Sequence, residues 1–349
     1  MEFQSRARFA TLVALVLAVM CGVFSASESA TAQKPYRVID QWKLPDIGGW
    51  DYLTADSGAH RLYITRGDHV DVLDSATGKQ IGTIGGLHGI HGVALDSAGK
   101  LGWISDGGAN AVVAFDRTTL ATVATIPAGT GPDGIIFEPA TQTVWAFNGR
   151  SKDVTVIDAA TEKVVATIAL PGRPEFPAVD GDGTVFDNIE DKNEIVRLDA
   201  RSKKLTAEWT LEGCEGPSGL AMDAAGRKLF PVCDGKKMAI VDADSGKTLA
   251  LATIGDGPDA AGWSAQFKLA FASCGEGVLA VVDTAAAGFP TIETLPTQRG
   301  ARTMAYDSAA DRIFLVTADF GPRPAATPDN PRPRAPIIPG TFTVIVVGR

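Results

Sequence analysis

The stretch VTVIDAATEKVVATI, from Val154 to Ile168, has two near copies upstream, VVAFDRTTLATVATI from Val112 and VDVLDSATGKQIGTI from Val70. The aspartate in each copy marks its place. Six such aspartates follow one another at intervals of 42, 42, 41, 43 and 41 residues: Asp74, Asp116, Asp158, Asp199, Asp242 and Asp283. A phrase repeated at a nearly fixed interval is typical of a protein built from equal structural units.

Each copy has the pattern of a β-hairpin. Apolar and β-branched residues alternate up to the aspartate, a turn such as Ala76–Lys79 follows, and a second alternating run completes the pair. Two more short strands precede each hairpin, for example at residues 92–95 and 101–105. An apolar spacing of two excludes helical repeats, and a parallel β-helix would need shorter coils. Four antiparallel strands per unit therefore predict the blades of an all-β propeller.

The ends of the chain predict seven blades. After Asp283 the next mark is due near residue 325, but the proline-rich run there cannot form a central strand. The seventh blade then takes its first three strands from residues 303–306, 312–317 and 342–347. We expect an N-terminal strand at residues 36–44 to complete that blade and close the ring, because closure removes two exposed sheet edges. Residues 321–340 form a proline-rich loop insert in the last blade, expected on the face of the channel mouth.

The second strand of each unit also recurs, as RLYITRG, KLGWISDGG, QTVWAFNGRS, GTVFDNIEDK, RKLFPVCDGKK, FKLAFASCGEG and DRIFLVTADFG. Together with the Val-x-Val-x-Asp-x-x-Thr-Gly-Lys hairpin, these residues resemble the YVTN-repeat family of exported β-propellers, the YncE-like proteins. The resemblance covers nearly all of the chain after residue 32. It implies a binding or scaffolding propeller without a common catalytic motif. One departure is Pro231, which predicts a bulge or local widening in the fifth blade.

The N-terminus has the pattern of an export signal. It holds two arginines, an apolar run over about residues 9–23, and Ala30-Thr31-Ala32 as a cleavage site of the A-x-A type. The alternative, a membrane anchor, needs roughly 20 apolar residues, and this run is shorter. We expect a signal peptide over residues 1–32, a periplasmic or secreted protein, and one propeller domain over residues 33–349 without a membrane span. The formal charge of −9 argues against nucleic acid as a partner.

Three cysteines follow residue 32, and an odd number leaves at least one thiol unpaired. Cys214 ends the link into the first strand of the fifth unit, and Cys233 ends its second strand. Adjacent strands lie about 5 Å apart, which suits a disulfide, and export exposes the pair to oxidation. We predict a Cys214–Cys233 bridge and a free Cys274. The alternatives are a Cys233–Cys274 bridge, which would have to join two blades, and three unpaired thiols.

The first strand of each unit is expected to line the central channel, so the residues that enter these strands should form a ring at one channel mouth. Counting back from each repeated aspartate, with the matching place in the seventh unit, gives Asp51, His91, Asp133, Glu175, Ser218, Asp259 and Arg302. Trp50 and His88 lie beside this ring in the sequence and break the pattern of the repeat. For Asp133 and Asp259 the alternative is a turn residue that binds main-chain donors.

A ring with four acids predicts a binding site for a small polar or cationic ligand or a protein partner. Carboxylates and imidazole also bind divalent metal ions, so a divalent ion is the candidate cofactor and His91 and Glu175 are its candidate ligands. The Gly-x-Ser-x-Gly, His-Glu-x-x-His, phosphate-loop and Cys-x-x-Cys-His motifs are absent from the sequence, and no catalytic residue is assigned. We expect a binding or scaffold module rather than an enzyme. The alternative is a metal-dependent, lactonase-like hydrolase with a divalent ion in the channel, an analogy of fold alone.

Overall fold

The computed structural model describes residues 34–44, 48–327, 333 and 335–349. The chain divides into two units, Met1–Lys34 and Pro35–Arg349. The signal peptide expected over residues 1–32 lies outside the described residues. Among the residues that are described, no helix is both long enough and apolar enough to cross a membrane.

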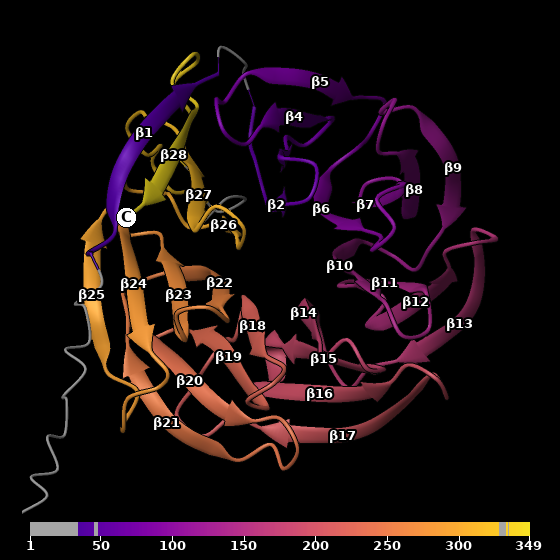
Figure 1. Cartoon of the computed structure of the whole chain (residues 1–349). Coiled ribbons are helices and arrows are strands. Elements are labelled where there is room, and N and C mark those ends of the chain that lie inside the picture. The colour runs from indigo at the N-terminus through magenta and orange to yellow at the C-terminus, as the bar shows by residue number, and fades with distance from the viewer. Residues whose placement is uncertain (1–33, 45–47, 328–332, 334) are drawn as a thin grey trace, which may run out of the picture. The chain divides into compact units, whose positions relative to one another are not determined.

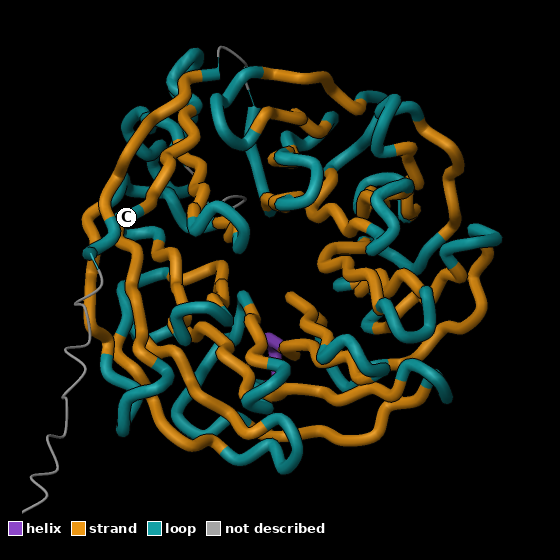
Figure 2. Tube along the Cα trace, in the orientation of Figure 1, coloured by secondary structure: helices purple, strands orange, loops and turns teal. Residues whose placement is uncertain are grey.

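The second unit is a seven-bladed β-propeller, as predicted, with four antiparallel strands in every blade (Figure 1). Figure 2 shows that strands and connecting turns make up nearly all of it, and a 3-10 turn at Glu190–Lys192 is the one helical element in the described part of the chain. Blades one to three comprise β2 (Leu53–Asp56), β3 (Arg61–Thr65), β4 (Val70–Asp74) and β5 (Gln80–Ile84); β6 (Ile90–Leu95), β7 (Leu101–Asp106), β8 (Ala111–Asp116) and β9 (Thr122–Pro127); and β10 (Pro132–Glu138), β11 (Thr143–Asn148), β12 (Asp153–Asp158) and β13 (Lys163–Ala169). Blades four to six comprise β14 (Pro174–Val179), β15 (Thr184–Ile189), β16 (Glu194–Asp199) and β17 (Lys204–Thr210); β18 (Leu220–Asp223), β19 (Lys228–Cys233), β20 (Lys237–Asp242) and β21 (Thr248–Thr253); and β22 (Pro258–Ser264), β23 (Leu269–Cys274), β24 (Val278–Asp283) and β25 (Thr291–Pro296).

The seventh blade joins the two ends of the propeller. It consists of β26 (Met304–Asp307), β27 (Arg312–Thr317), β28 (Thr343–Gly348) and, as its outermost strand, β1 (Arg37–Lys43). β1 runs antiparallel to β28, from the pair Arg37 and Gly348 to the pair Lys43 and Thr343. The prediction that the N-terminal strand closes the ring is therefore confirmed.

The apolar core is divided into seven clusters, and each cluster lies between two neighbouring blades. Middle strands such as β4 bury successive residues on both faces, because a neighbouring blade covers each face. Outer strands such as β17 alternate between exposed and half-buried residues. The blades thus bury their apolar surface against one another, and one cluster joins blade seven to blade one.

The repeated aspartates stabilise the hairpin turns. The carboxylate of Asp74 accepts hydrogen bonds from the main-chain nitrogens of Ala76 and Thr77, at 3.1 and 2.8 Å, and from the Thr77 hydroxyl at 2.7 Å. The bond from the hydroxyl is the main cause of a lowered Asp74 pKa. Asp116, with Thr119, and Asp242, with Ser245, make the same contacts. The repeated aspartates that identify the fold therefore form turns, and they are not among the residues predicted at the channel mouth.

The sequence predicts a bulge or a local widening at Pro231, and the bulge is absent. Leu229 pairs with Val241 and Val232 pairs with Met238, so β19 and β20 keep one register across the proline. Proline has no N–H to donate to the sheet, and the strands lose pairs at this point without gaining an extra residue.

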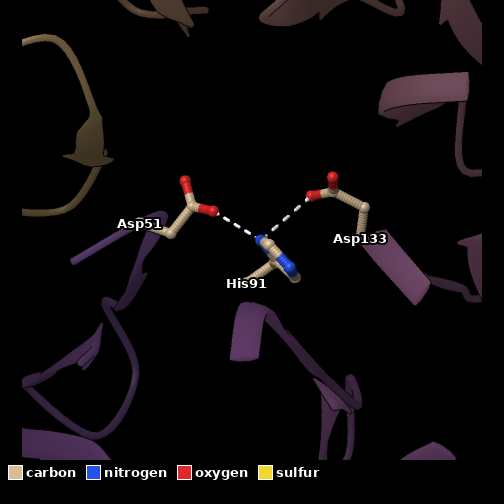
Figure 3. A group of neighbouring side chains, drawn as sticks. All are labelled: Asp51, His91 and Asp133. Atoms are coloured by element: carbon tan, nitrogen blue, oxygen red, sulfur yellow. Dashed lines mark hydrogen bonds and ion pairs between the residues drawn. The ribbon is translucent and has the colours of Figure 1, made fainter. Parts of the chain in front are cut away.

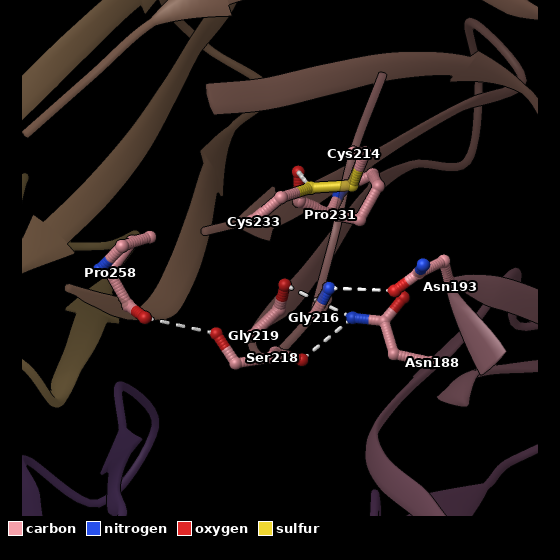
Figure 4. The surroundings of a disulfide bond; sticks show 9 residues. All are labelled: Asn188, Asn193, Cys214, Gly216, Ser218, Gly219, Pro231, Cys233 and Pro258. Atoms are coloured by element: carbon pink, nitrogen blue, oxygen red, sulfur yellow. Dashed lines mark hydrogen bonds between the residues drawn. A yellow bond between two sulfur atoms is a disulfide. The ribbon is translucent and has the colours of Figure 1, made fainter. Parts of the chain in front are cut away.

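The predicted disulfide is confirmed. Cys214 and Cys233 are bonded, with their Cα atoms 5.3 Å apart, and Cys274 is a buried free thiol. Figure 4 shows the bridge in the fifth blade, close to Pro231. It ties the link that enters β18 to the end of β19.

Removal of the closing strand should destabilise the propeller strongly. We expect a chain beginning at residue 45 to melt more than about 10 °C below a chain beginning at residue 33, because it loses the buried rings of Tyr36 and Trp42. Circular dichroism measures both transitions. A synthetic peptide of residues 33–44 added to the shorter chain should recover part of the loss, and equal melting temperatures without the peptide would contradict closure by β1.

The cysteines should show one thiol and one bridge. Burial raises the pKa of the Cys274 thiol to about 12, so the native protein should not react with iodoacetamide at neutral pH. In denaturant without reductant, a chain beginning at residue 33 should take up a single label, on Cys274, as judged by mass spectrometry. Replacement of both Cys214 and Cys233 by serine should cost about 3 kcal/mol of unfolding free energy. Three labels on the unreduced chain would disprove the bridge.

Candidate functional site

Three of the four acids and the histidine of the predicted ring enter their strands at irregular points of the sheet. The register between the first and second strands of a blade shifts around each of these residues. The shifts bracket His91, Asp133, Glu175 and Asp259, at Ile90/Val93, Pro132/Ile135, Pro174/Pro177 and Pro258/Ala260. A bulge turns a side chain out of the regular alternation. Four ring residues therefore depart from the pleat where the strands meet the channel mouth.

Hydrogen bonds between blades hold the main chain of the ring. The Thr65 hydroxyl, near the end of β3, donates to the carbonyl of His91 at 3.0 Å, and the Ser105 hydroxyl of β7 donates to the carbonyl of Asp133 at 2.6 Å. The Asn188 amide donates to the carbonyl of Ser218 at 2.6 Å, and Ser273 donates to the carbonyl of Arg302. In each case a buried polar side chain of one blade fixes the ring residue of the next blade.

Asp51, His91 and Asp133, from three consecutive blades, meet in one cluster (Figure 3). The Nδ1 atom of His91 lies 2.6 Å from Asp51 and 3.6 Å from Asp133. Burial opposes a charge on the imidazole, but the hydrogen bond to Asp51 and the charges of nearby acids outweigh it and raise the pKa of His91 to about 9. The imidazole is therefore protonated at neutral pH and lies between two carboxyl groups.

The rest of the ring gathers buried carboxyl groups, of Glu175, Asp259 and Asp133, with shifted pKa values. Burial and the charges of Asp133 and Asp259 raise the pKa of Glu175 to about 8. Burial raises the pKa of Asp259 to about 7, although Arg302 lies 3.1 Å away and lowers it in part. Burial, aided by the charge of Asp51, also raises the pKa of Asp133 to about 6. The carboxyl groups of this site thus retain protons that a solvated acid would lose.

Aromatic rings lie among these acids. Tyr52 precedes β2 and Phe176 belongs to β14, two strands that lie across the opening from each other in Figure 1. Their rings approach to 4.6 Å between centroids. Burial and the charges of four ring acids raise the pKa of Tyr52 well above its usual value: Asp259, Glu175, Asp51 and Asp133. Asp187 of β15 is fully buried close by, and burial together with the charge of Glu175 raises its pKa. Two aromatic rings from different blades thus meet beside the acids.

Three other predicted residues have roles of their own. The Ser218 hydroxyl donates to the carbonyl of Pro258 at 3.0 Å, which is a contact between blades. His88 is exposed and is not part of the cluster of Asp51, His91 and Asp133. Trp50 packs against Phe320 and Phe342, with centroid distances of 6.1 and 5.4 Å.

The contacts of the acids bear on two roles expected from the sequence, that of a turn residue and that of a metal ligand. Within the described residues, the carboxyl groups of Asp133 and Asp259 accept no hydrogen bond from a main-chain nitrogen, and their partners are His91 and Arg302. The role of a simple turn residue therefore does not fit them. The three ligand atoms that lie within 4.8 Å of one another belong to Asp51, His91 and Asp133, and Glu175 is outside that set.

Several residues of the site escaped prediction. Tyr52 follows Trp50 and Asp51 directly, and this triplet has no counterpart in the other units. The polar residue that recurs near the end of the second strand could have revealed the bonds between blades, because it is visible in most copies of that strand: Thr65, Ser105, Asn188, Ser273 and Thr317.

Comparisons with known proteins support the fold. No family model matches the chain, and no curated protein matches it. A hydrazine synthase structure from Kuenenia stuttgartiensis is similar, with a TM-score of 0.69, 15% identity, and coverage of 77% of this chain and 93% of that chain. The structure of U3-55K has a TM-score of 0.72 at 10% identity and covers 89% of this chain and 99% of that chain. The RRP9 WD40 repeats have a TM-score of 0.73 at 10% identity, with coverage of 90% and 99%. At such identities the likeness shows a WD40-like propeller fold alone, and membership of the YVTN-repeat family stays a prediction.

The raised pKa of Glu175 should make stability depend on pH. Since its pKa rises from 4.5 to about 8 on folding, the native state holds an extra proton in this range, and stability should fall as the pH rises from about 4.5 to 8. Glu175→Gln removes the free-energy cost of ionising a buried carboxyl group. At pH 9 the variant should therefore melt roughly 2 °C above the parent protein, and at pH 4 it should melt no higher. Differential scanning calorimetry across this range makes the comparison.

Glu208→Gln is the matched control, because Glu208 lies exposed on the outer strand β17. Its melting temperature should follow that of the parent protein at every pH. A Glu175→Gln profile parallel to the parent would contradict a raised pKa for Glu175.

Proposed function

We propose that this protein is an exported binding module that takes a ligand with an organic cationic group at the channel mouth. The observation that carries this proposal is that the ring has more carboxyl groups than cationic side chains. Four carboxyl groups, of Asp51, Asp133, Glu175 and Asp259, face the cationic side chains of His91 and Arg302. Arg173 also acts on Asp133 and Glu175, but it is half exposed and pairs with Glu190. A partly buried site with more acids than bases gains most from a ligand that brings positive charge.

An ammonium or guanidinium group suits this site better than a bare metal ion. The His91 imidazolium already lies between Asp51 and Asp133, at the place where an ion would bind. In the described part of the chain Glu175 forms no ion pair, although the charge of Arg173 lowers its pKa in part, and the rings of Tyr52 and Phe176 lie beside the acids. Aromatic faces attract organic cations, and carboxylates accept their hydrogen bonds.

Export and family kinship are part of the same proposal. The Cys214–Cys233 bridge supports a periplasmic or secreted location, because disulfides persist in oxidising compartments. The seven-bladed fold and the repeated turn motif support kinship with the YVTN-repeat propellers. A protein partner could present the cationic group as a lysine or arginine side chain.

Isothermal titration calorimetry with n-butylammonium tests the proposal. We expect saturable binding with a Kd of about 1 mM and release of protons at pH 7.5, because a bound cation lowers the pKa of Glu175. Comparison of buffers with different ionisation enthalpies measures that release. The pair of changes Asp133→Asn and Glu175→Gln should weaken binding at least about tenfold, whereas Glu208→Gln should leave it unchanged.

Neutral n-pentanol is the control ligand. Equal affinity for n-pentanol, or no saturable binding of the ammonium ion, would contradict a site for organic cations.

A metal-dependent, lactonase-like hydrolase is the second candidate. The close approach of ligand atoms from Asp51, His91 and Asp133 favours it, since these groups suit a divalent ion once the imidazole has lost its proton. Stoichiometric metal in the purified protein, together with hydrolysis of γ-butyrolactone that Asp51→Asn abolishes, would establish this candidate in place of the first.

A further inference from the structure

A pocket of about 620 Å³ lies beside the acidic ring, bounded in part by the long loop of the seventh blade. Its charged lining is Arg299, Arg302 and Arg323, and the described residues contribute no acid to its wall. In a chain with a formal charge of −9, this gathering of three guanidinium groups is a local reversal of charge. We call it the arginine pocket.

The guanidinium groups of these arginines retain N–H donors that are free to bind a ligand. Neither Arg299 nor Arg323 forms an ion pair with a described residue, and both are exposed. Arg302 has one ion pair, from its NH1 atom to Asp259 at 3.1 Å, and a guanidinium carries five N–H donors. The planar arrangement of these donors fits carboxylate and phosphate oxygens in pairs. The pocket therefore has the chemistry to hold an anion.

The described residues at the two ends of the long loop pair with each other, and they line the pocket together with Trp50 and Arg302. The main-chain nitrogen of Gly321 donates to the carbonyl of Pro336 at 2.8 Å, and that of Ile338 donates to the carbonyl of Asp319 at 2.8 Å. Between these bonds, Phe320 pairs with Ile337 in an antiparallel bridge. This part of the wall is thus formed before any ligand arrives.

The remaining lining is apolar and aromatic. The rings of Trp50 and Phe320 lie 6.1 Å apart, and Ile337 also faces the pocket. Gly300 permits this arrangement, because its φ is +85° and a Cβ there would come within 2.7 Å of the Phe320 ring. Phe320 nevertheless remains exposed, as one of the few large apolar side chains that do. Exposed aromatic surface next to unpaired guanidinium groups marks a binding site.

We propose that the arginine pocket binds an organic anion. Its carboxylate or phosphate group is held by Arg299 and Arg302, and its apolar or planar body packs against Trp50 and Phe320. This site is separate from the proposed cation site, and it stands whether or not the ring binds a cation. The two sites are joined by Arg302, which lines the pocket and pairs with Asp259 of the ring.

Calorimetric titration of the chain beginning at residue 33 with benzoate, phenyl phosphate and inorganic phosphate tests the proposal. Phenyl phosphate should bind at least about tenfold more tightly than inorganic phosphate, because only the former can pack on Trp50. The ratio between benzoate and phenyl phosphate distinguishes a carboxylate site from a phosphate site. Arg299→Gln should weaken both phenyl ligands about tenfold. Binding should also change the tryptophan fluorescence, and Trp50→Phe should abolish that change.

Arg201→Gln is the matched control, because Arg201 is an exposed arginine paired with Asp182 in the fourth blade. Its affinities and its melting temperature should equal those of the parent protein. Absence of saturable binding by both phenyl ligands, or affinities that Arg299→Gln leaves unchanged, would overturn the proposal. Equal affinity for phenyl phosphate and inorganic phosphate would overturn the role of Trp50 and Phe320.

Discussion

Packing between neighbouring blades is the interaction on which the rest of this structure depends. Every apolar cluster is shared by two blades, so a blade alone would expose both faces of its middle strands. Only a closed ring gives each blade two neighbours. Closure here relies on β1, because its Trp42 and the following Leu44 complete the cluster between the seventh blade and the first. This outer strand therefore matters more to stability than its exposed position suggests.

The candidate site follows from the same ring. Because the first strands converge on one axis, each blade can offer one side chain at the channel mouth, and in four blades a bulge turns that side chain out of the regular alternation. The hydroxyls of Thr65 and Ser105 then fix the main chain of the next blade at that point. The hydrogen bonds that join the blades thus also position the site. A substitution at a blade interface would therefore move a ring residue that is not itself replaced.

Much of the fold could be predicted from the sequence, because a turn motif of aspartate and threonine repeats at equal spacing and turn chemistry is local. The residues of the ring were predicted by counting back from each repeated aspartate, because each of them occupies the same place in its unit. The bulge expected at Pro231 is absent, because the proline pairs with Leu220 of β18 and loses only its pairing toward β20, which leaves the register unchanged. The roles of Tyr52 and the arginine pocket could not be predicted. They depend on residues brought together from different blades, which periodicity does not reveal.

The charges of the site suggest why it is built in this way. Partly buried acids that repel one another cost stability, and proteins retain such groups mainly where function requires them. Here the cost is limited by protonation of Glu175 and Asp259 and by the imidazolium of His91. Arg302 then lies between the acids on one side and the arginine pocket on the other, so a charge bound on either side alters the field at Asp259. An anion in the pocket would draw the Arg302 guanidinium away from Asp259, and the ring would then bind a cation more tightly. A ligand with both charges, held across Arg302, would satisfy the two sites together.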